Sequence, residues 1–173
     1  MKKIIIAIDS FKGCLTSAEA GKAAEKGIKS INPSCHTSVI PIADGGEGLL
    51  DVLITATKGK YITLSAHGPL MKMAKTHYGL SGNGRTAIIE MAAISGLPLV
   101  PIEQRNPMLT TTFGTGELIK DALNKGCRNF IIGIGGSATN DAGLGMLQAL
   151  GFRFLDKSGH TLGTGGQIME AVA

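Results

Sequence analysis

The sequence predicts an α/β fold with a mainly parallel sheet, flanking helices and a second lobe that is partly antiparallel. Three observations predict it. Strand-like and helical segments alternate at the start of the chain, they alternate again after residue 107, and short strands around a turn at residues 81–84 separate the two parts. The 173 residues, 43% of them hydrophobic, suffice for one domain or for two small lobes sharing a cleft. We expect an incomplete two-lobe fold, with a first lobe over residues 1–60 and a second over residues 61–173.

The first part of the chain alternates between strand and helix. Residues 3–8, KIIIAI, are mostly apolar and β-branched, which is typical of a strand buried on both faces of a parallel sheet. Residues 16–19 have the spacing of a capping box and predict the start of a helix that ends at Ile31. A second strand is predicted over residues 38–43 and a second helix over residues 49–57.

The middle of the chain is predicted to be antiparallel. Strand-like pieces lie at residues 61–64, 74–80 and 86–91. The sequence SGNG at residues 81–84 predicts a hairpin turn in which two residues take positive φ. A helix over residues 116–124 then restores the alternation.

The last part of the chain predicts a buried strand over residues 129–134, a loop over residues 135–141 and a helix through Leu150. Residues 152–159 predict a strand edge followed by a turn. A helix-like segment begins at residue 167, and the sequence stops within it without a cap. We therefore expect the chain to be part of a longer polypeptide.

Composition excludes several classes of protein. The net charge of +4 comes from scattered basic residues, and aromatic residues make up only 4%, which argues against nucleic-acid binding and suits a small anionic ligand. The three cysteines form no Cys-x-x-Cys pair, so disulfides and zinc are not expected. The sequence shows no apolar run long enough to span a bilayer and no secretory signal, so we expect a cytoplasmic protein without a membrane partner.

The strongest local signal is a glycine-rich loop between the strand ending near Ile134 and the following helix. Backbone N–H groups at such a junction point at anions, and hydroxyl side chains add donors. The predicted phosphate-binding residues of this loop are Gly135, Gly136, Ser137 and Thr139. The carboxylate of Asp141 is a candidate ligand for Mg²⁺. The alternative is an ordinary tight turn in which Thr139 or Asn140 caps the helix.

A second glycine-rich turn carries two carboxylates. Asp44 and Glu47 flank Gly45 and Gly46 directly after a predicted strand, where side chains at the carboxyl edge of a sheet meet ligands. They are candidates to position a metal or to accept a hydroxyl proton, and the two glycines are candidate phosphate contacts. The alternative is that Asp44 caps the helix that follows.

The loop after the first strand holds Asp9, Ser10 and Lys12 in the same topological place. Lys12 is a candidate to neutralise a phosphoryl group during transfer; the alternative is a solvated surface lysine. A fourth candidate is the hydroxyl-rich segment over residues 106–117, for which ordinary helix capping and turn formation is favoured over ligand binding. Thr115 is the predicted cap of the helix that follows. The four histidines have no metal-ligand spacing and are expected on exposed edges.

Two other functions compete at this stage. Gly133, Gly135 and Ala138 match a dinucleotide fingerprint, with Asp156 about 20 residues further on, as a dinucleotide-binding oxidoreductase domain requires. A non-catalytic metabolite-binding protein could use the same loops. The sequence contains neither a Walker phosphate loop nor a Gly-x-Ser-x-Gly elbow, which argues against a P-loop enzyme and an acyl hydrolase.

The motifs at residues 9–13, 41–48, 106–118 and 133–141 together resemble the bacterial type of the glycerate kinase family. The resemblance extends over essentially the whole chain, in order. It implies an enzyme of two α/β lobes that phosphorylates glycerate to phosphoglycerate with ATP and Mg²⁺.

By the same resemblance, the cleft would be lined by Asp9, Ser10, Lys12, Asp44, Glu47, Ser137, Asn140 and Asp141. Chemistry then suggests Lys12 as phosphoryl clamp, the glycine loop as phosphate cradle, Asp44 or Asp141 with Mg²⁺, and one carboxylate near the glycerate hydroxyl. Members of this family are about twice as long. We therefore expect this chain to be the amino-terminal half, with little activity alone and a tendency to self-associate.

Overall fold

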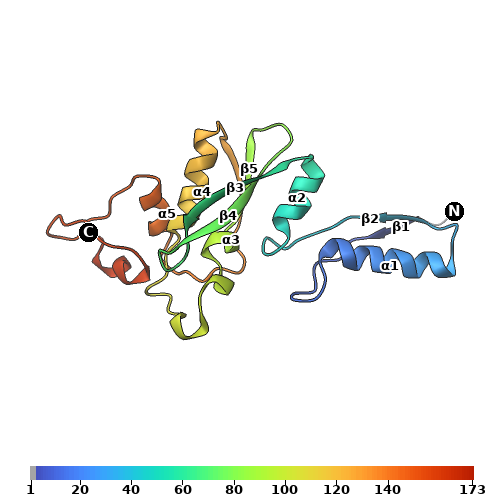
Figure 1. The fold of residues 1–173 in the computed structure, drawn as a ribbon, viewed down its shortest axis with the longest axis horizontal. Coiled ribbons are helices and arrows are strands. Elements are labelled where there is room, and N and C mark those ends of the chain that lie inside the picture. The colour runs from blue at the N-terminus through green and yellow to red at the C-terminus, as the bar shows by residue number, and fades with distance from the viewer. Residues whose placement is uncertain (1–2) are drawn as a thin grey trace.

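The computed structural model describes residues 3–173; Met1 and Lys2, with which the first predicted lobe begins, lie outside the described residues. Two sheets follow one another along an elongated molecule, and the two ends of the chain lie far apart along its long axis (Figure 1). The mixed α/β class is confirmed, with a parallel sheet, a mixed sheet and flanking helices.

The amino-terminal unit contains β1 (Lys3–Ile6), α1 (Ser17–Ile31) and β2 (His36–Val39). The two strands are parallel, with Lys3 opposite His36. The predicted capping box is confirmed, because the Thr16 hydroxyl accepts from the amide of Glu19 and the Glu19 carboxylate accepts from the amide of Thr16. The second strand lies earlier than the predicted residues 38–43.

The prediction that the first strand is buried on both faces is wrong. Ile6 is buried, whereas Ile4 is 36% and Ile5 59% exposed. This sheet has two strands, and α1 packs on it from one side, so the other side is left open. Ile131 and Ile132 of β6 (Asn129–Gly133) are likewise 43% and 37% exposed, because β6 is the edge strand of the second sheet.

The second sheet has the order β3-β4-β5-β6. β4 (Met73–Leu80) pairs antiparallel with β3 (Lys60–His67) on one side and with β5 (Thr86–Glu90) on the other. β5 and β6 are parallel, with Glu90 opposite Gly133. β3, β5 and β6 therefore run the same way and end at the same edge of the sheet. The predicted hairpin is confirmed, but of its turn residues only Gly84 takes positive φ, at 70°.

Three helices pack on this sheet, α2 (Leu49–Thr57), the short α3 (Ala92–Ser95) and α4 (Phe113–Asn124), and α5 (Leu144–Ala149) packs on α4. The described residues also contain three short 3₁₀ segments, η1 (Leu97–Leu99), η2 (Ile102–Gln104) and η3 (Gly166–Ala171). The predicted cap at Thr115 is wrong. α4 begins earlier, and Thr112 occupies its N-cap position. Thr115 is buried within the helix, where its hydroxyl forms a hydrogen bond with the hydroxyl of Ser95.

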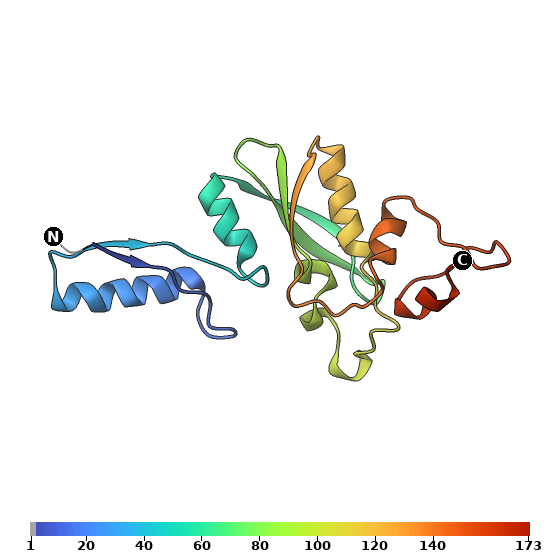
Figure 2. The ribbon, with the colours of Figure 1, turned by 180° about the vertical axis from the view of Figure 1, so that it is seen from behind.

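The main core lies between the sheet and α4, around Tyr78, Ile89 and Leu118. A second cluster joins Leu50 and Ile54 of α2 to Ile88 of β5. α2 thus packs on the second sheet, although the predicted boundary at residue 60 assigns it to the first lobe. The division into 1–60 and 61–173 stays a prediction. Figure 2 shows α2 against this sheet and the amino-terminal unit extending away from it.

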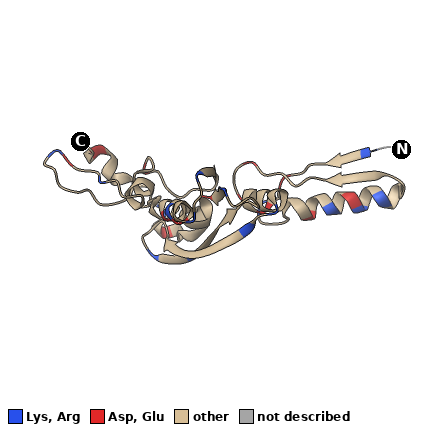
Figure 3. Ribbon diagram, turned by 90° about the horizontal axis from the view of Figure 1, so that it is seen from above, with Lys and Arg blue, Asp and Glu red and all other residues tan. Residues whose placement is uncertain are grey.

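Charged residues are spread over the described chain. Figure 3 shows Lys and Glu alternating along α1, as expected for a solvated helix face, with the remaining charges distributed over both parts. Within residues 3–173, no helix is both long and apolar enough to cross a membrane.

Candidate functional site

Two glycine loops meet at the edge where β6 ends. The amide of Gly135 donates to the carbonyl oxygen of Gly45 over 3.2 Å. A Cβ atom at Gly135 would lie 2.7 Å from the Cα of Gly46, and one at Gly133 would lie 2.5 Å from the Gly45 oxygen. Only glycine allows this close approach of two backbones. The structure therefore brings the loops over residues 44–48 and 133–136 into direct contact.

The carboxylate of Asp44 shapes its own loop. One of its oxygens accepts from the amide of Gly46 over 3.0 Å, and the side chain is otherwise exposed. The alternative that Asp44 caps α2 is wrong, because the helix begins after Gly48 and its amide donor at Leu50 bonds to Glu90 instead. Asp44 thus keeps one carboxylate oxygen for a ligand.

Glu90 is a site residue that the sequence interpretation missed. It lies at the carboxyl end of β5 and accepts the amide of Leu50 over 2.7 Å, so it holds the start of α2 beside the two glycine loops. Burial raises the pKa of the Glu90 carboxyl, while the amides of Leu50 and Gly48 counteract this. The signal for it was its place at the end of a predicted strand, which is where side chains reach ligands.

A pocket of about 350 Å³ lies between the loop after β1 and the start of α2; Ser10, Lys12 and Glu47 are among its lining residues, and Asp9 and Asp44 are not. Asp9 accepts the amide of Ser10 over 2.6 Å, and Phe11 and Leu15 close a tight backbone turn. Lys12 and Glu47 both line this pocket, and its apolar walls are formed by Phe11, Leu15, Pro41, Ile42 and Val52. Predicted residues from two separate loops therefore border one hollow.

Backbone hydrogen bonds also join the glycine-rich loop after β6 to the segment around Ser95 and Leu97. The amide of Leu97 bonds to the oxygen of Gly136, and the amide of Ala138 bonds to the oxygen of Ser95. The hydroxyls of Ser137 and Thr139 lie 2.8 Å apart and bond each other. Their loop is thus rigidly placed, with Asn140 exposed beside it. Neither Thr139 nor Asn140 caps the next helix, which begins after Gly143.

Asp141 has a different role from the predicted one. Its side chain is 1% exposed, and its two oxygens accept from the hydroxyl of Thr111, from the amide and hydroxyl of Thr112, and from the amides of Gly143 and Gly145. Five protein donors leave no open face for a hydrated Mg²⁺ ion, which keeps several waters when bound. Asp141 is a buried anchor that joins the start of α4 to the start of α5.

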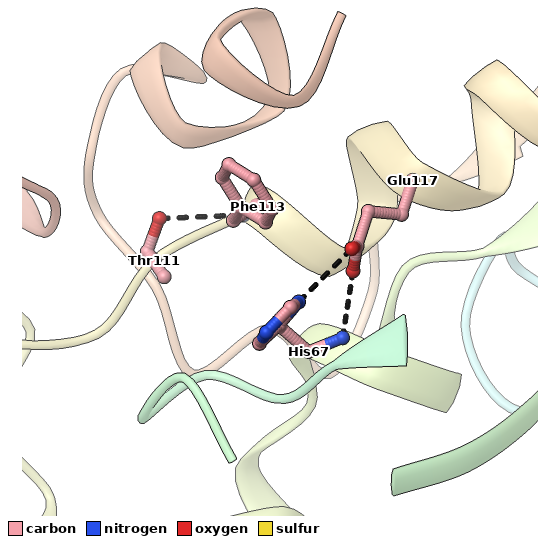
Figure 4. Close-up of polar contacts among 4 residues, drawn as sticks. All are labelled: His67, Thr111, Phe113 and Glu117. Atoms are coloured by element: carbon pink, nitrogen blue, oxygen red, sulfur yellow. Dashed lines mark hydrogen bonds and ion pairs between the residues drawn. The ribbon is translucent and has the colours of Figure 1, made fainter. Parts of the chain in front are cut away.

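A second contact that the sequence interpretation missed joins His67 to Glu117 (Figure 4). The ring Nδ1 of His67 lies 2.9 Å from Oε1 of Glu117, and its backbone amide donates to Oε2 over 2.7 Å. The ring of Phe113 contacts the imidazole edge-on, at 5.5 Å between centroids. This pair fixes the end of β3 to the start of α4, so His67 is held in place and does not lie on a free edge as predicted.

The dinucleotide alternative does not fit this geometry. α5 begins at Leu144, eleven residues after Gly133, whereas a dinucleotide fingerprint opens the helix directly. Asp156 accepts the amides of Ser158 and His160 in a tight turn beside an antiparallel bridge between Leu155 and Thr161. It therefore lies at a hairpin tip and at no parallel strand end.

Comparison with known proteins adds an independent observation. The family model described as the glycerate kinase family matches residues 4–173. The glycerate kinase of Bacillus subtilis (strain 168) is 54% identical over 171 residues, which are 99% of this chain and 45% of that protein. The glycerate 2-kinase of Escherichia coli (strain K12) is 51% identical over 170 residues, 98% of this chain and 45% of that protein.

A solved structure agrees with these sequences. The protein assigned as glycerate kinase 2 from Salmonella typhimurium LT2 superimposes with a TM-score of 0.87 at 48% identity, covering 99% of this chain and 46% of that one. The chain thus spans about half the length of the relatives that it matches.

Proposed function

Because this chain belongs to the glycerate kinase family, we propose that it supplies the amino-terminal half of a cleft in which ATP phosphorylates glycerate. The observation that carries the proposal is the bond between Gly135 and Gly45, which joins two glycine loops next to the pocket of Lys12 and Glu47. Phosphoryl transfer requires such an arrangement, since catalysis there consists of positioning and of charge neutralisation.

The chemical step follows from the groups at this edge. The glycerate hydroxyl oxygen attacks the γ-phosphorus, a new oxygen–phosphorus bond forms, and the bond to the bridging oxygen of ADP breaks. Lys12 neutralises charge on the phosphoryl oxygens, and the loop of Gly135 and Gly136 receives them. The hydroxyl proton passes to a carboxylate, for which Asp9, Asp44 and Glu47 are the candidates.

The donor set also fits Mg²⁺, which proteins hold with one or two carboxylates together with substrate phosphates. Asp44 is exposed and has a carboxylate oxygen beyond the one that bonds Gly46. Among the described residues, no group of three or more side chains of the metal-ligating kinds gathers at one place. We therefore propose Asp44, with Glu47 as a second candidate, as the protein ligand. When bound, the ion would neutralise phosphate charge.

The rest of the cleft is proposed to come from the part of the relatives that this chain does not cover. The open side of the β1–β2 sheet, with Ile5 at 59% and Ile40 at 48% exposure, suits a further packed layer. Without it, we expect self-association through this side. A kinase that uses ATP and a small organic acid is also expected in the cytoplasm, and its partners are those two molecules.

The test combines the chain with the complementary half. The chain and the segment of the Bacillus subtilis relative that it does not cover are co-purified, and glycerate-dependent ADP release is measured with Mg²⁺. We expect little or no turnover from the chain alone and clear turnover from the pair. Lys12→Met should lower the turnover of the pair by about 100-fold or more, while the matched variant Lys26→Met on exposed α1 should not.

Three results would change this assignment. Equal turnover of Lys12→Met and Lys26→Met would remove Lys12 from the site. Binding of glycerate without any ADP release would favour the non-catalytic metabolite-binding protein. Turnover of the isolated chain close to that of a full-length relative would contradict the proposal that this chain supplies only the amino-terminal half of the cleft.

A further inference from the structure

A second hollow lies on the other side of the glycine-rich loop. It measures about 260 Å³, is open to solvent, and is lined by the loop at Ser137–Thr139 and by residues of the segment that leads from Leu97 to Pro107. Arg105 is the only charged side chain among the described residues that line it. An isolated cation in a hollow walled by Leu97, Val100 and Pro107 favours a small anion with a short carbon skeleton.

A hydrogen bond to the backbone orients the guanidinium of Arg105. Its Nε donates to the carbonyl oxygen of Val100 over 3.2 Å, and Val100 itself is 2% exposed. In the described chain no carboxylate lies within salt-bridge distance of Arg105. The two terminal amino groups therefore remain to form the paired hydrogen bonds with which arginine binds a planar carboxylate.

Neutral donors complete the hollow. The side-chain oxygen of Asn106 accepts the amide of Met108 over 3.0 Å, so its NH₂ group is left to donate. The hydroxyls of Ser137 and Thr139 bond each other over 2.8 Å, and the Ser137 hydroxyl also lies within 3.4 Å of the carbonyl oxygen of Thr139. The guanidinium of Arg105, the side-chain amide of Asn106 and the two hydroxyls thus belong to residues that line one hollow.

We propose that this Arg105 hollow binds the carboxylate of the small hydroxy acid substrate, which makes Arg105 a substrate-binding residue that the predicted site did not contain. The inference rests on the proposed function. The loop supports the placement, because its glycine end contacts the loop of Asp44 and its hydroxyl end lines the hollow. An acid anchored by its carboxylate at the hydroxyl end directs its own hydroxyl toward the glycine end, where the phosphoryl group is proposed to lie.

Residue-resolved titration of the chain tests this directly, because every lining residue belongs to it. The ¹⁵N-labelled protein is titrated separately with glycerate, with propionate and with inorganic phosphate, and the amide signals of Asn106, Ala138 and Thr139 are followed. We expect glycerate and propionate to shift these signals. Arg105→Met should lower the affinity for glycerate and for propionate by about tenfold or more. Arg105→Lys, which lacks the planar guanidinium, should bind both acids more weakly than the wild type and more tightly than Arg105→Met. The matched control Arg153→Met, an exposed arginine elsewhere, should bind as the wild type does.

The outcomes separate this inference from the proposed function. It is overturned if glycerate does not shift these signals, if Arg105→Met binds like Arg153→Met, or if phosphate binds here more tightly than both acids, which would assign the hollow to a phosphoryl group. Failure of ADP release by the complemented pair, with acid binding at Arg105 intact, would contradict the kinase proposal and leave the carboxylate site standing.

Discussion

The amide of Gly135 bonds to the carbonyl oxygen of Gly45, although ninety residues of chain separate the two. One loop follows β2 and the other follows β6, so the contact connects the amino-terminal unit to the edge of the second sheet. Since Asp44 adjoins the first loop and Ser137 the second, this backbone bond sets the spacing between the candidate carboxylate and the candidate anion-binding loop.

Gly135→Ala is expected to force the two loops apart. The added Cβ would lie 2.7 Å from the Cα of Gly46, which is backbone and has little freedom to shift. We expect the free energy of unfolding to fall by about 1–3 kcal/mol, as for other overpacked sites. Urea unfolding measures the change. The control is Gly163→Ala, where a Cβ meets open space; equal stability of the two variants would show that the loops do not depend on this approach.

Asp141→Asn is expected to destabilise the chain without removing a metal site. The variant replaces one of two oxygens that together accept from five donors. An NH₂ group in the place of Oδ1 would face the amide of Gly143, and one in the place of Oδ2 would face the amides of Thr112 and Gly145. We expect a loss of about 2–4 kcal/mol in the free energy of unfolding.

The exposed neighbour supplies the control for Asp141. Asn140→Ala should leave the free energy of unfolding nearly unchanged in the same urea experiment. A Mg²⁺ titration is run on both variants. Specific loss of Mg²⁺ binding in Asp141→Asn, with stability preserved, would contradict the anchoring role and restore the metal assignment.

The sequence predicted most of the helices and strands, because their signals are local. The Thr16–Glu19 box and the apolar spacing after Leu49 require nothing distant, and the structure has α1 and α2 at those places. The burial of Ile5 and Ile131 could not be predicted in this way. Their apolar runs are typical of two-sided burial, but burial depends on how many layers the chain provides, and β1 and β6 each lack a neighbour on one side.

The sequence predicted which loops form the candidate site better than it predicted the roles of individual side chains. Strand ends and glycines predicted ligand-binding loops at residues 44–48 and 133–136, and the family resemblance implied that both line one cleft. The strands before these loops, β2 and β6, belong to different sheets, so a shared sheet edge does not explain their contact. Asp141, Glu90 and His67 show the limit of that reasoning. Their partners, at Thr112, Leu50 and Glu117, are 29, 40 and 50 residues away in sequence. No spacing rule covers contacts that only the folded packing creates.

Glu90→Gln is expected to change how stability depends on pH. Burial raises the pKa of this carboxyl above its ordinary value of 4.5, so the folded state binds the proton more strongly than the unfolded state does. Stability of the wild type therefore falls as the pH rises from 4.5 through the raised pKa, and the cost is complete above it. Glutamine carries no charge but can still accept the amide of Leu50.

Urea unfolding between pH 4.5 and 8 measures this effect. The slope of stability against pH should become smaller in Glu90→Gln and stay unchanged in the exposed control Glu170→Gln. Glu90→Ala, which has no acceptor for the amide of Leu50, should instead lose about 1 kcal/mol at neutral pH. The proposed titration of Glu90 is contradicted if the glutamine variant keeps the full wild-type slope.

Ile5→Glu is expected to abolish self-association of the isolated chain. Ile5 pairs with Ser38, so Ile5 and Ile40 lie on the same side of the β1–β2 sheet, and both are about half exposed. A carboxylate there would have to be buried in any contact that covers this side, at a cost of several kcal/mol. Sedimentation velocity over a range of concentrations measures the association.

The control for Ile5 is Ile31→Glu, at the end of α1, where the side chain is 87% exposed and lies outside the sheet. It should associate as the wild type does. Both variants are also mixed with the complementary half of the relative. Because we propose that this half covers the same open side, Ile5→Glu should lose complementation as well. Continued complementation by Ile5→Glu would show that the missing half packs elsewhere, and continued self-association would show that copies of the chain meet through another surface.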